Sequence, residues 1–145
     1  MSHTDTLALD LLTALPRLRR YARVLVGERD GADELVEEVL AGVRRKERVR
    51  PSKVDCVTWL FGLIHAAHRP DRQSSTHRAD SVPVTAELCA QVLRLPIEER
   101  EVLMLVAVER LAYADIAIVL DVPVATVLLT LTRAREHLSA IESRP

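Results

Sequence analysis

Aromatic side chains are scarce in this chain: one Trp, one Phe and two Tyr occur among 145 residues. A hydrophobic core must therefore be built from Leu, Val, Ile and Ala, within a hydrophobic fraction of 48%. Glycine is scarce too, with four residues. Because Leu and Ala lose little side-chain freedom in a helix, this composition favours an all-α protein.

Disulfides and membrane segments are equally unsupported. The two cysteines, Cys56 and Cys89, are too few and too far apart for a disulfide framework. No apolar run approaches the roughly 20 residues that cross a bilayer. The N-terminus, MSHTDTLALD, has no basic cluster ahead of its apolar residues and so differs from a signal peptide. These absences predict a cytoplasmic protein that does not enter a membrane.

The sequence also lacks the residue patterns of an enzyme. It has no nucleophile–base set, no phosphate-binding loop and no cluster of metal ligands. His65 and His68 are three residues apart, with Cys56 upstream, but two imidazoles without a third ligand of suitable spacing make a poor metal site. We interpret them as surface or interface histidines, and we expect no catalytic activity, cofactor, metal or small-molecule substrate.

A basic excess is missing where a DNA-binding protein would need one. The net charge is −1, and residues 84–145 carry six Lys and Arg against nine Asp and Glu. Neutralising phosphates supplies much of the affinity of a DNA-binding module, so such modules usually show a basic face. The C-terminal half shows no such excess.

The N-terminal half predicts a helical unit over residues 5–68. Pro16 divides its first apolar pattern, so we expect a short helix and then a second one that begins near Pro16 and ends at Gly27. Asp30 is expected to cap the next helix, and a further helix runs from Lys53 to His68. The helix after Asp30 has a buried stripe of Leu35, Val36, Val39, Leu40 and Val43. The outer face of this helix is acidic. In the helical pattern before Gly27, we interpret four arginines as a solvated face: Arg17, Arg19, Arg20 and Arg23.

Residues 69–84 are polar, contain two prolines and show no periodicity, so they predict a linker. A second helical unit follows over residues 85–143. Its expected helices start at Thr85, at Pro96 and at Ala114, and a turn at Asp121–Pro123 precedes the last helix, Val124–Ile141. This order is that of a helix-turn-helix. The last helix has one buried stripe: Val124, Val127, Leu131, Ala134, Leu138 and Ile141.

These phrases together resemble a known family, the extracytoplasmic-function sigma factors. The second unit resembles their region 4, with an LPxxxRxVL opening, a YxxIAxxL helix and a VPVxTVxxxLxRAREHL helix. The matching residues are Leu95-Pro96, Arg100, Val102-Leu103, Tyr113, Ile116-Ala117, Leu120, Val122-Pro123-Val124, Thr126-Val127, Leu131 and Arg133-Ala134-Arg135. The first unit resembles region 2, through LPRLRRYARVLVG (Leu15–Gly27), ADELVEEVL (Ala32–Leu40) and TWLFGLI (Thr58–Ile64). The LPRLRRYAR phrase is similar to general-stress sigma factors and to the sigma-like domain of PhyR-type response regulators.

The resemblance implies a role for each unit. In this family region 2 binds the RNA polymerase core and reads the promoter −10 element, while region 4 reads the −35 element. The core-binding helix of the family corresponds here to Glu34, Leu35, Val36, Glu37 and Glu38. The −10 face corresponds to Trp59, Phe61 and His65. A mixed acidic and apolar helix face suits a basic, amphipathic partner surface.

The sequence departs from the family pattern at the positions that face DNA. In the last helix Leu128, Leu129 and Thr130 replace Lys, Ser and Arg. At about 100° per residue, its outward face becomes Ala125, Leu129, Thr132, Arg133 and Glu136. In the first unit Gly62, His65 and Ala66 replace the Arg, Arg and Asn of the family phrase. Contact with promoter DNA is therefore expected to be weakened.

Two functions follow from these observations. The first is a sigma factor that directs RNA polymerase to promoters. The second is a sigma mimic, which binds an anti-sigma factor and so releases the true sigma factor without reading DNA. A helix-turn-helix regulator that does not contact polymerase is disfavoured by the resemblance of the first unit to region 2.

Overall fold

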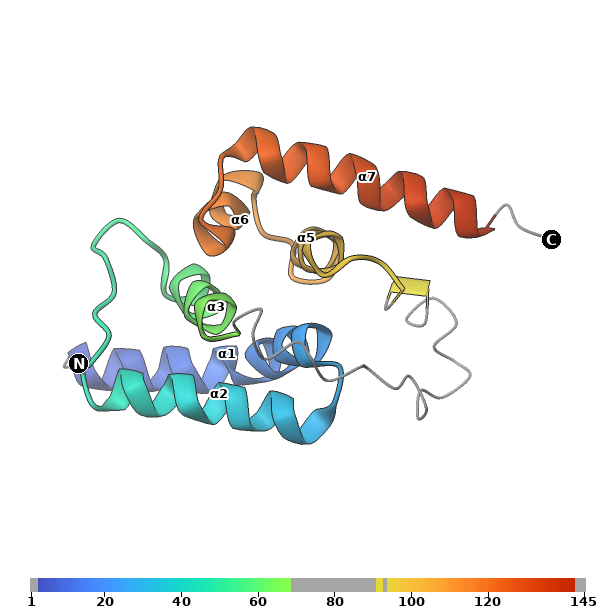
Figure 1. Ribbon diagram of the computed structural model, residues 1–145. Helices are drawn as coiled ribbons and strands as arrows, with labels where there is room; N and C mark the ends of the chain where they lie inside the picture. Colours follow the sequence, from blue (N-terminus) through green and yellow to red (C-terminus); the bar gives the residue numbers. More distant parts are fainter. Residues whose placement is uncertain (1–2, 69–90, 93, 143–145) are drawn as a thin grey trace.

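The computed structural model describes residues 3–68, 91–92 and 94–142, and within these ranges it contains helices and no strands. The helices are α1 (His3–Val26), α2 (Arg29–Arg44), α3 (Cys56–Ala67), α5 (Ile97–Ala107), α6 (Tyr113–Leu120) and α7 (Val124–Glu142), shown in Figure 1. The all-α prediction is confirmed. The predicted linker, residues 69–84, and the helix start at Thr85 lie outside the described residues.

Helix α1 runs unbroken through Pro16, so the predicted division into two helices is wrong. Proline inside a helix removes one backbone hydrogen bond and typically costs about 3 kcal/mol. Here Pro16 is exposed, while Ala14 and Leu18 on either side of it are 1% and 0% exposed in a common core. Because both halves of α1 bury side chains in the same core, packing holds the helix together across the proline.

The turn between α1 and α2 follows the sequence signals with a small shift. Gly27 adopts a φ of 85°, a left-handed conformation that favours glycine, and ends α1 as predicted. Helix α2 begins at Arg29 with Glu28 at its N-cap, so Asp30 lies in the first turn rather than at the cap. A carboxylate there complements the helix dipole without capping it. The predicted stripe of α2 faces inward: Leu35, Val36, Val39 and Val43 are buried and Leu40 is half-buried.

Helix α3 places Phe61 in the core beside Tyr21 of α1. Asp55 caps the helix, and its side chain accepts a hydrogen bond from the backbone N–H of Val57. Phe61 is fully buried, and the ring of Tyr21 meets it edge-on at a centroid distance of 5.1 Å. The guanidinium of Arg17 lies 5.5 Å from the Phe61 ring centroid, within cation–π range.

Helices α5, α6 and α7 form the predicted helix-turn-helix unit. Asp121 ends α6 with a φ of 54°, and the backbone N–H of Val122 closes the turn on the carbonyl of Ala117. Of the predicted stripe on α7, Val127, Leu131 and Ala134 are buried and Leu138 is half-buried. Val124 is 41% exposed, which corrects its assignment to the stripe; it is the first residue of α7 and extends past the core. The side chain of Ile141 lies outside the described residues.

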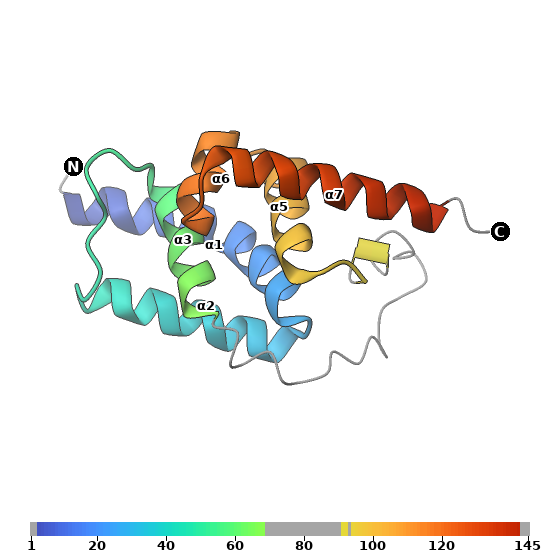
Figure 2. The same cartoon turned by 45° about the horizontal axis from the view of Figure 1, so that its top comes forward.

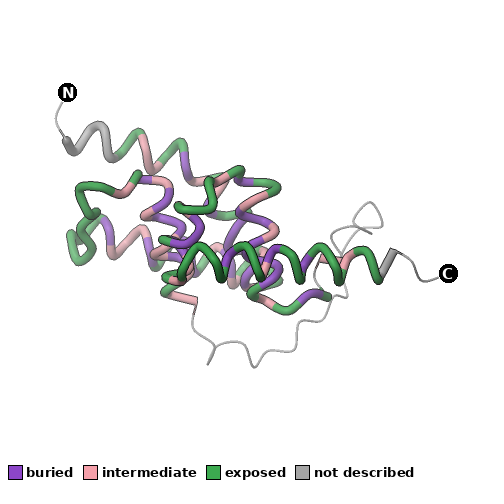
Figure 3. The backbone as a smooth tube through the Cα atoms, turned by 90° about the horizontal axis from the view of Figure 1, so that it is seen from above, coloured by how far each residue is buried: buried purple, intermediate pink, exposed green. Residues whose placement is uncertain are grey.

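The two helical units pack against each other around one core. Helix α1 packs on α5 and α3 packs on α6, so α3 and α5 lie centrally between α2 and α7 in Figures 1 and 2. Buried side chains of both units, including Phe61, Leu105 and Ile116, belong to one hydrophobic cluster. In Figure 3 the buried segments gather at the crossing of the helices, while α7 shows a largely exposed outer side.

Within the described residues no single helix is long and apolar enough to cross a membrane. The helices α6 and α7 together have the length and composition of a membrane span, but the two are bent by 99° relative to each other.

Candidate functional site

The outer face of α2 carries the acidic side chains of the predicted core-binding helix. Glu34, Glu37 and Glu38 are exposed, whereas Leu35 and Val36 are 3% and 2% exposed and point into the core. The apolar pair therefore cannot contact a partner in this fold, which corrects the five-residue prediction to three residues. Leu35 and Val36 belong to the apolar stripe of α2, and helical periodicity turns that stripe toward α1, on which α2 packs. Helix α2 lies on the opposite side of the molecule from α7 (Figures 1 and 2).

The residues assigned to a −10 face do not form one exposed surface. Phe61 is fully buried, so its assignment to a DNA-facing surface is wrong; it is the central aromatic of the core. Trp59 is half-buried against the same core. His65 faces the second unit, where its Nδ1 lies 2.8 Å from a carboxylate oxygen of Glu101.

The outward face of α7 is as the sequence predicts. All five of its residues are exposed: Ala125, Leu129, Thr132, Arg133 and Glu136. Leu129 is 52% exposed, and Leu128 beside it is 43% exposed. The hydroxyl of Thr132 donates to the carbonyl of Leu128 within the helix. Apolar surface thus occupies positions where the family pattern has Lys and Ser.

Buried polar contacts join the two units to each other. They do not lie on the outer face of α2 or on the outward face of α7. The carboxylate of Glu109, just after α5, is fully buried and receives hydrogen bonds from two arginines of α1. The Nε atoms of Arg17 and Arg20 each lie 2.7 Å from a different oxygen of Glu109. Arg17 also donates to the backbone carbonyl of Glu109 at 2.9 Å. Pairing with Glu109 raises the pKa of Arg20.

Glu101 of α5 makes a second contact between the units. Besides its ion pair with His65, it accepts a hydrogen bond from the hydroxyl of Tyr21 at 3.4 Å. Interaction with the Glu101 carboxylate raises the pKa of His65, against the lowering effect of burial. Burial and the nearby Glu101 carboxylate raise the pKa of Tyr21 well above its usual range.

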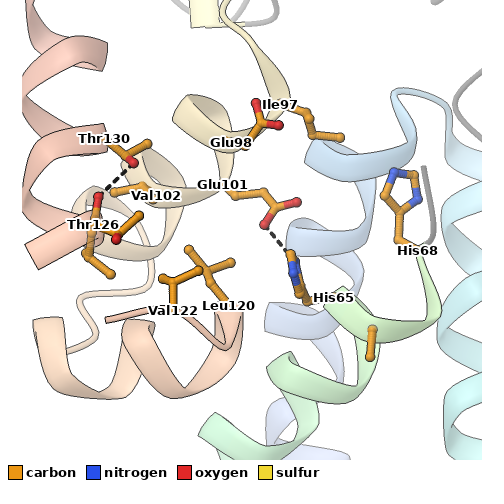
Figure 4. Close-up of a pocket in the computed structure, with 12 residues that line it drawn as sticks. His65, His68, Ile97, Glu98, Glu101, Val102, Leu120, Val122, Thr126 and Thr130 are labelled. Carbon is orange, nitrogen blue, oxygen red and sulfur yellow. Dashed lines mark hydrogen bonds and ion pairs between the residues drawn. The ribbon is translucent and has the colours of Figure 1, made fainter. Parts of the chain in front are cut away.

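A pocket of about 390 Å³ opens beside this contact. Its lining includes His65 and Ala66 of α3, Glu101 of α5, and Thr126 and Thr130 of α7. Figure 4 shows the His65 ring and the Glu101 carboxylate directed toward one another in its lining. Because both units contribute to the walls, the pocket exists only while the units are packed together. In the described part of the chain, no three His, Cys, Asp or Glu side chains are grouped to hold a metal ion.

The His65–Glu101 pair predicts a pH-dependent stability. Since the folded pKa of His65 is raised, its contribution is fully present below the ordinary histidine pKa of about 6.5 and is lost as the pH rises through the folded value. We expect the unfolding temperature of the wild type to fall toward that of His65→Gln between about pH 6 and pH 8. Thermal unfolding of both proteins across this range measures the effect. If the difference in unfolding temperature between the wild type and His65→Gln grows with pH, the pairing of His65 with Glu101 is contradicted.

Sequence reasoning missed Glu101 and Glu109 as contact residues. It interpreted all four arginines of α1 as a solvated face. Arg19 and Arg23 are exposed as expected, but Arg17 and Arg20 pair with Glu109. One signal was available: Glu109 follows the apolar run VLMLVAV, where an acid needs a partner if it is buried.

Within the described residues, three helices with an acidic face on α2 are followed by three helices that end in a helix-turn-helix, an arrangement typical of the sigma-70 class. Family models agree with this assignment: residues 11–65 match the Sigma2 domain of PhyR, and residues 87–138 match sigma-70 region 4. The chain is 33% identical over 159 residues to the ECF RNA polymerase sigma factor EcfG of Rhodopseudomonas palustris, covering 97% of this chain and 87% of that protein. The chain therefore belongs to the extracytoplasmic-function sigma factor family.

Solved structures show the same fold. One is the PhyRSL–NepR complex from Sphingomonas sp. Fr1, with a TM-score of 0.75, 28% identity, and coverage of 97% of this chain and 88% of that chain. Another is the sigma factor RpoE in complex with the anti-sigma factor NepR from Bartonella quintana. It gives a TM-score of 0.78 at 19% identity, with 95% and 98% of the two chains covered. At that identity the second similarity concerns the fold alone.

Proposed function

We propose that this chain acts as a sigma factor that docks on the RNA polymerase core through the outer face of α2 and places α7 at the promoter −35 element. The observation that carries the proposal is the α2 helix itself. Its apolar residues are fixed in the core, so Glu34, Glu37 and Glu38 are presented on a rigid, exposed helix. The similarity to EcfG over nearly the whole chain supports a polymerase partner.

The charge of this face suits a basic partner surface. Three carboxylates within five residues of one helix attract a complementary basic surface over a Debye length of about 10 Å at 0.1 M salt. Burial of the apolar stripe means that association does not require α2 to rearrange. Both effects favour rapid, salt-sensitive association.

A titration of the fluorescently labelled chain with purified RNA polymerase core tests the proposal. We expect saturable binding that weakens as salt is raised. Absence of binding at micromolar core would overturn the docking role of α2.

A second function is favoured by one observation: the recognition face carries Leu128 and Leu129, 43% and 52% exposed, where the family pattern has Lys and Ser. Such a face is better suited to a protein than to phosphates. The solved relatives include the anti-anti-sigma factor PhyR complexed with the anti-sigma factor NepR. In this alternative the chain is a sigma mimic. It would bind an anti-sigma factor tightly and would not support transcription initiation.

Placing a positive charge on the outward face of α7 tests whether this face contacts DNA. We expect Leu129→Lys to raise the affinity for non-specific duplex DNA and to steepen the slope of log K against log salt by about 0.9. Val108→Lys is the matched control, because Val108 is exposed on the same unit but lies after α5. Fluorescence anisotropy between about 50 and 200 mM salt measures both slopes. Equal slopes for the two variants would mean that the α7 face does not contact DNA.

A further inference from the structure

The outer side of α2 carries charges of both signs, and the two signs are separated along the helix. The acids lie in the first ten residues of α2, and no base follows them before its last residue: Asp30, Asp33, Glu34, Glu37 and Glu38. Arg44 is that last residue, Arg45 is the C-cap, and both are exposed. Arg48 follows in the loop, where its Cγ lies 4.0 Å from a β-carbon built on Gly42. One end of α2 is therefore acidic and the other is basic.

The helix dipole accounts for only part of this separation. Its influence falls off within the first and last turns, whereas Glu37 and Glu38 lie in the middle of α2. Side chains four residues apart are neighbours on a helix, and like charges at this spacing repel each other. Asp30 and Glu34 have this spacing, as do Glu34 and Glu38. A cationic surface that covers the acidic end would therefore stabilise α2.

Helical geometry places the acids and the bases on one face. At about 100° per residue, Glu37 and Arg44 lie about 20° apart on one flank of this face. Glu38 and Arg45 lie about 20° apart on the other flank. Ala41 lies between the flanks, midway between each acid and its base. A half-turn about an axis at Ala41 therefore exchanges the two ends of α2 and sets each acid opposite a base.

We propose that two copies of this chain pair antiparallel through the outer faces of their α2 helices. Glu37 of each copy meets Arg44 of the other, and Glu38 meets Arg45, so every ion pair forms twice. A two-fold interface requires such a self-complementary face. The dimer covers the same acids that the polymerase core would bind, so dimerisation and core docking exclude each other. That last consequence rests on the proposed function.

The dimer is expected to be weak and reversible. Exposed ion pairs are individually weak, and Arg45 also lies 3.4 Å from Glu47 of its own chain. Ala41 and Gly42 are small and half-buried, so the two helix axes can approach to about 8 Å. The chain is therefore monomeric at low concentration and dimeric at high concentration. An abundant chain would limit its own access to the core.

Sedimentation equilibrium of the full-length chain tests the pairing. Samples of up to about 0.2 mM chain are compared at about 0.05 M and about 0.5 M salt. At low salt the average mass should rise above the 16.2 kDa of one chain toward twice that value, and high salt should return it to 16.2 kDa. A mass of 16.2 kDa at every concentration in low salt would overturn the proposal.

Charge reversal at either end of α2 places like charges opposite each other. The double variants Arg44→Glu with Arg45→Glu, and Glu37→Lys with Glu38→Lys, should each be monomeric. An equal mixture of the two variants should form a dimer, because every pair then regains opposite charges. If each variant alone dimerises as the wild type does, the contact lies on another surface and the proposal is wrong.

Two further variants control for total charge and for folding. Arg19→Glu with Arg23→Glu changes two exposed arginines of α1 and should dimerise as the wild type does. Acids at the end of a helix oppose its dipole, so Arg44→Gln with Arg45→Gln removes the charge without that cost. This neutral variant should keep its helical circular dichroism and dimerise about 10-fold more weakly. Undiminished dimerisation of the neutral variant would contradict the pairing.

Sedimentation of the chain alone involves neither polymerase nor DNA, so its result is independent of the proposed function. If the wild type dimerises in this way but binds no polymerase core, the proposed function fails and the α2 pairing stands. If the wild type binds core and stays monomeric, the pairing fails and the proposed function stands.

Discussion

Replacing Phe61 by alanine is expected to lower the free energy of unfolding by about 3–5 kcal/mol, the usual cost of removing a fully buried phenylalanine. Phe61 is 0% exposed, meets Tyr21 edge-on and lies under the guanidinium of Arg17. The aromatic pair adds about 0.5–1.5 kcal/mol beyond the area buried. Chemical denaturation of the wild type and the variant measures the loss.

The control for this prediction is Tyr113→Ala, since Tyr113 is 41% exposed at the start of α6. It should cost about 0.5 kcal/mol or less. The comparison also tests whether Phe61 is a core residue. If Phe61 lay on a DNA-facing surface, as the family resemblance implies, Phe61→Ala would cost no more than Tyr113→Ala.

The second large effect is expected on binding. Changing Glu34, Glu37 and Glu38 together to lysine should weaken binding to the polymerase core by about 100-fold or more, because each attraction becomes a repulsion. An anti-sigma factor that uses the same face should lose a similar factor. Since all three side chains are exposed, the unfolding temperature should change little.

A matched triple variant separates the face from the total charge. Glu47, Glu98 and Glu136 are also exposed and lie outside α2, and changing them to lysine gives the same net charge elsewhere. This control should bind core within a few-fold of the wild type. Unchanged affinity of the Glu34, Glu37 and Glu38 variant for both partners would show that the binding face lies elsewhere.

Local signals in the sequence predicted most helix positions because the residues that carry them act locally. Gly27 and Asp121 end helices through their own backbone conformation, and the stripe of α2 follows from its spacing. Pro16 misled the prediction because its effect is local, whereas the packing of Ala14 and Leu18 that overrides it is not. Local patterns therefore predict the positions of helices better than they predict where packing offsets the cost of a proline inside a helix.

The family phrases predicted the fold more firmly than the function because they are largely core residues. Arg100, Val102, Ile116, Val127 and Leu131 all belong to the region 4 pattern, and all are buried. They specify how α5, α6 and α7 pack. The outward side chains, such as Leu129, are where the sequence differs from the family, and those positions decide whether DNA is read.

The sequence could not predict which residues pair between the two units. Arg17 and Glu109 are 92 residues apart, and neither residue indicates its partner. An arginine-rich helix face and an isolated acid are each consistent with solvation. Only the packing of α1 on α5 brings them together.

The central claim is that this sigma fold directs transcription, and promoter-dependent initiation measures it most directly. The wild-type chain is combined with purified RNA polymerase core and a pool of random promoter sequences, and the initiated transcripts are sequenced. Transcripts should start at a small set of sites that share −35 and −10 elements, and the Glu34, Glu37 and Glu38 lysine variant should reduce them strongly. No sequence-selective transcripts from wild type that is bound to core, together with tight binding to an anti-sigma factor, would contradict the claim and establish a mimic instead.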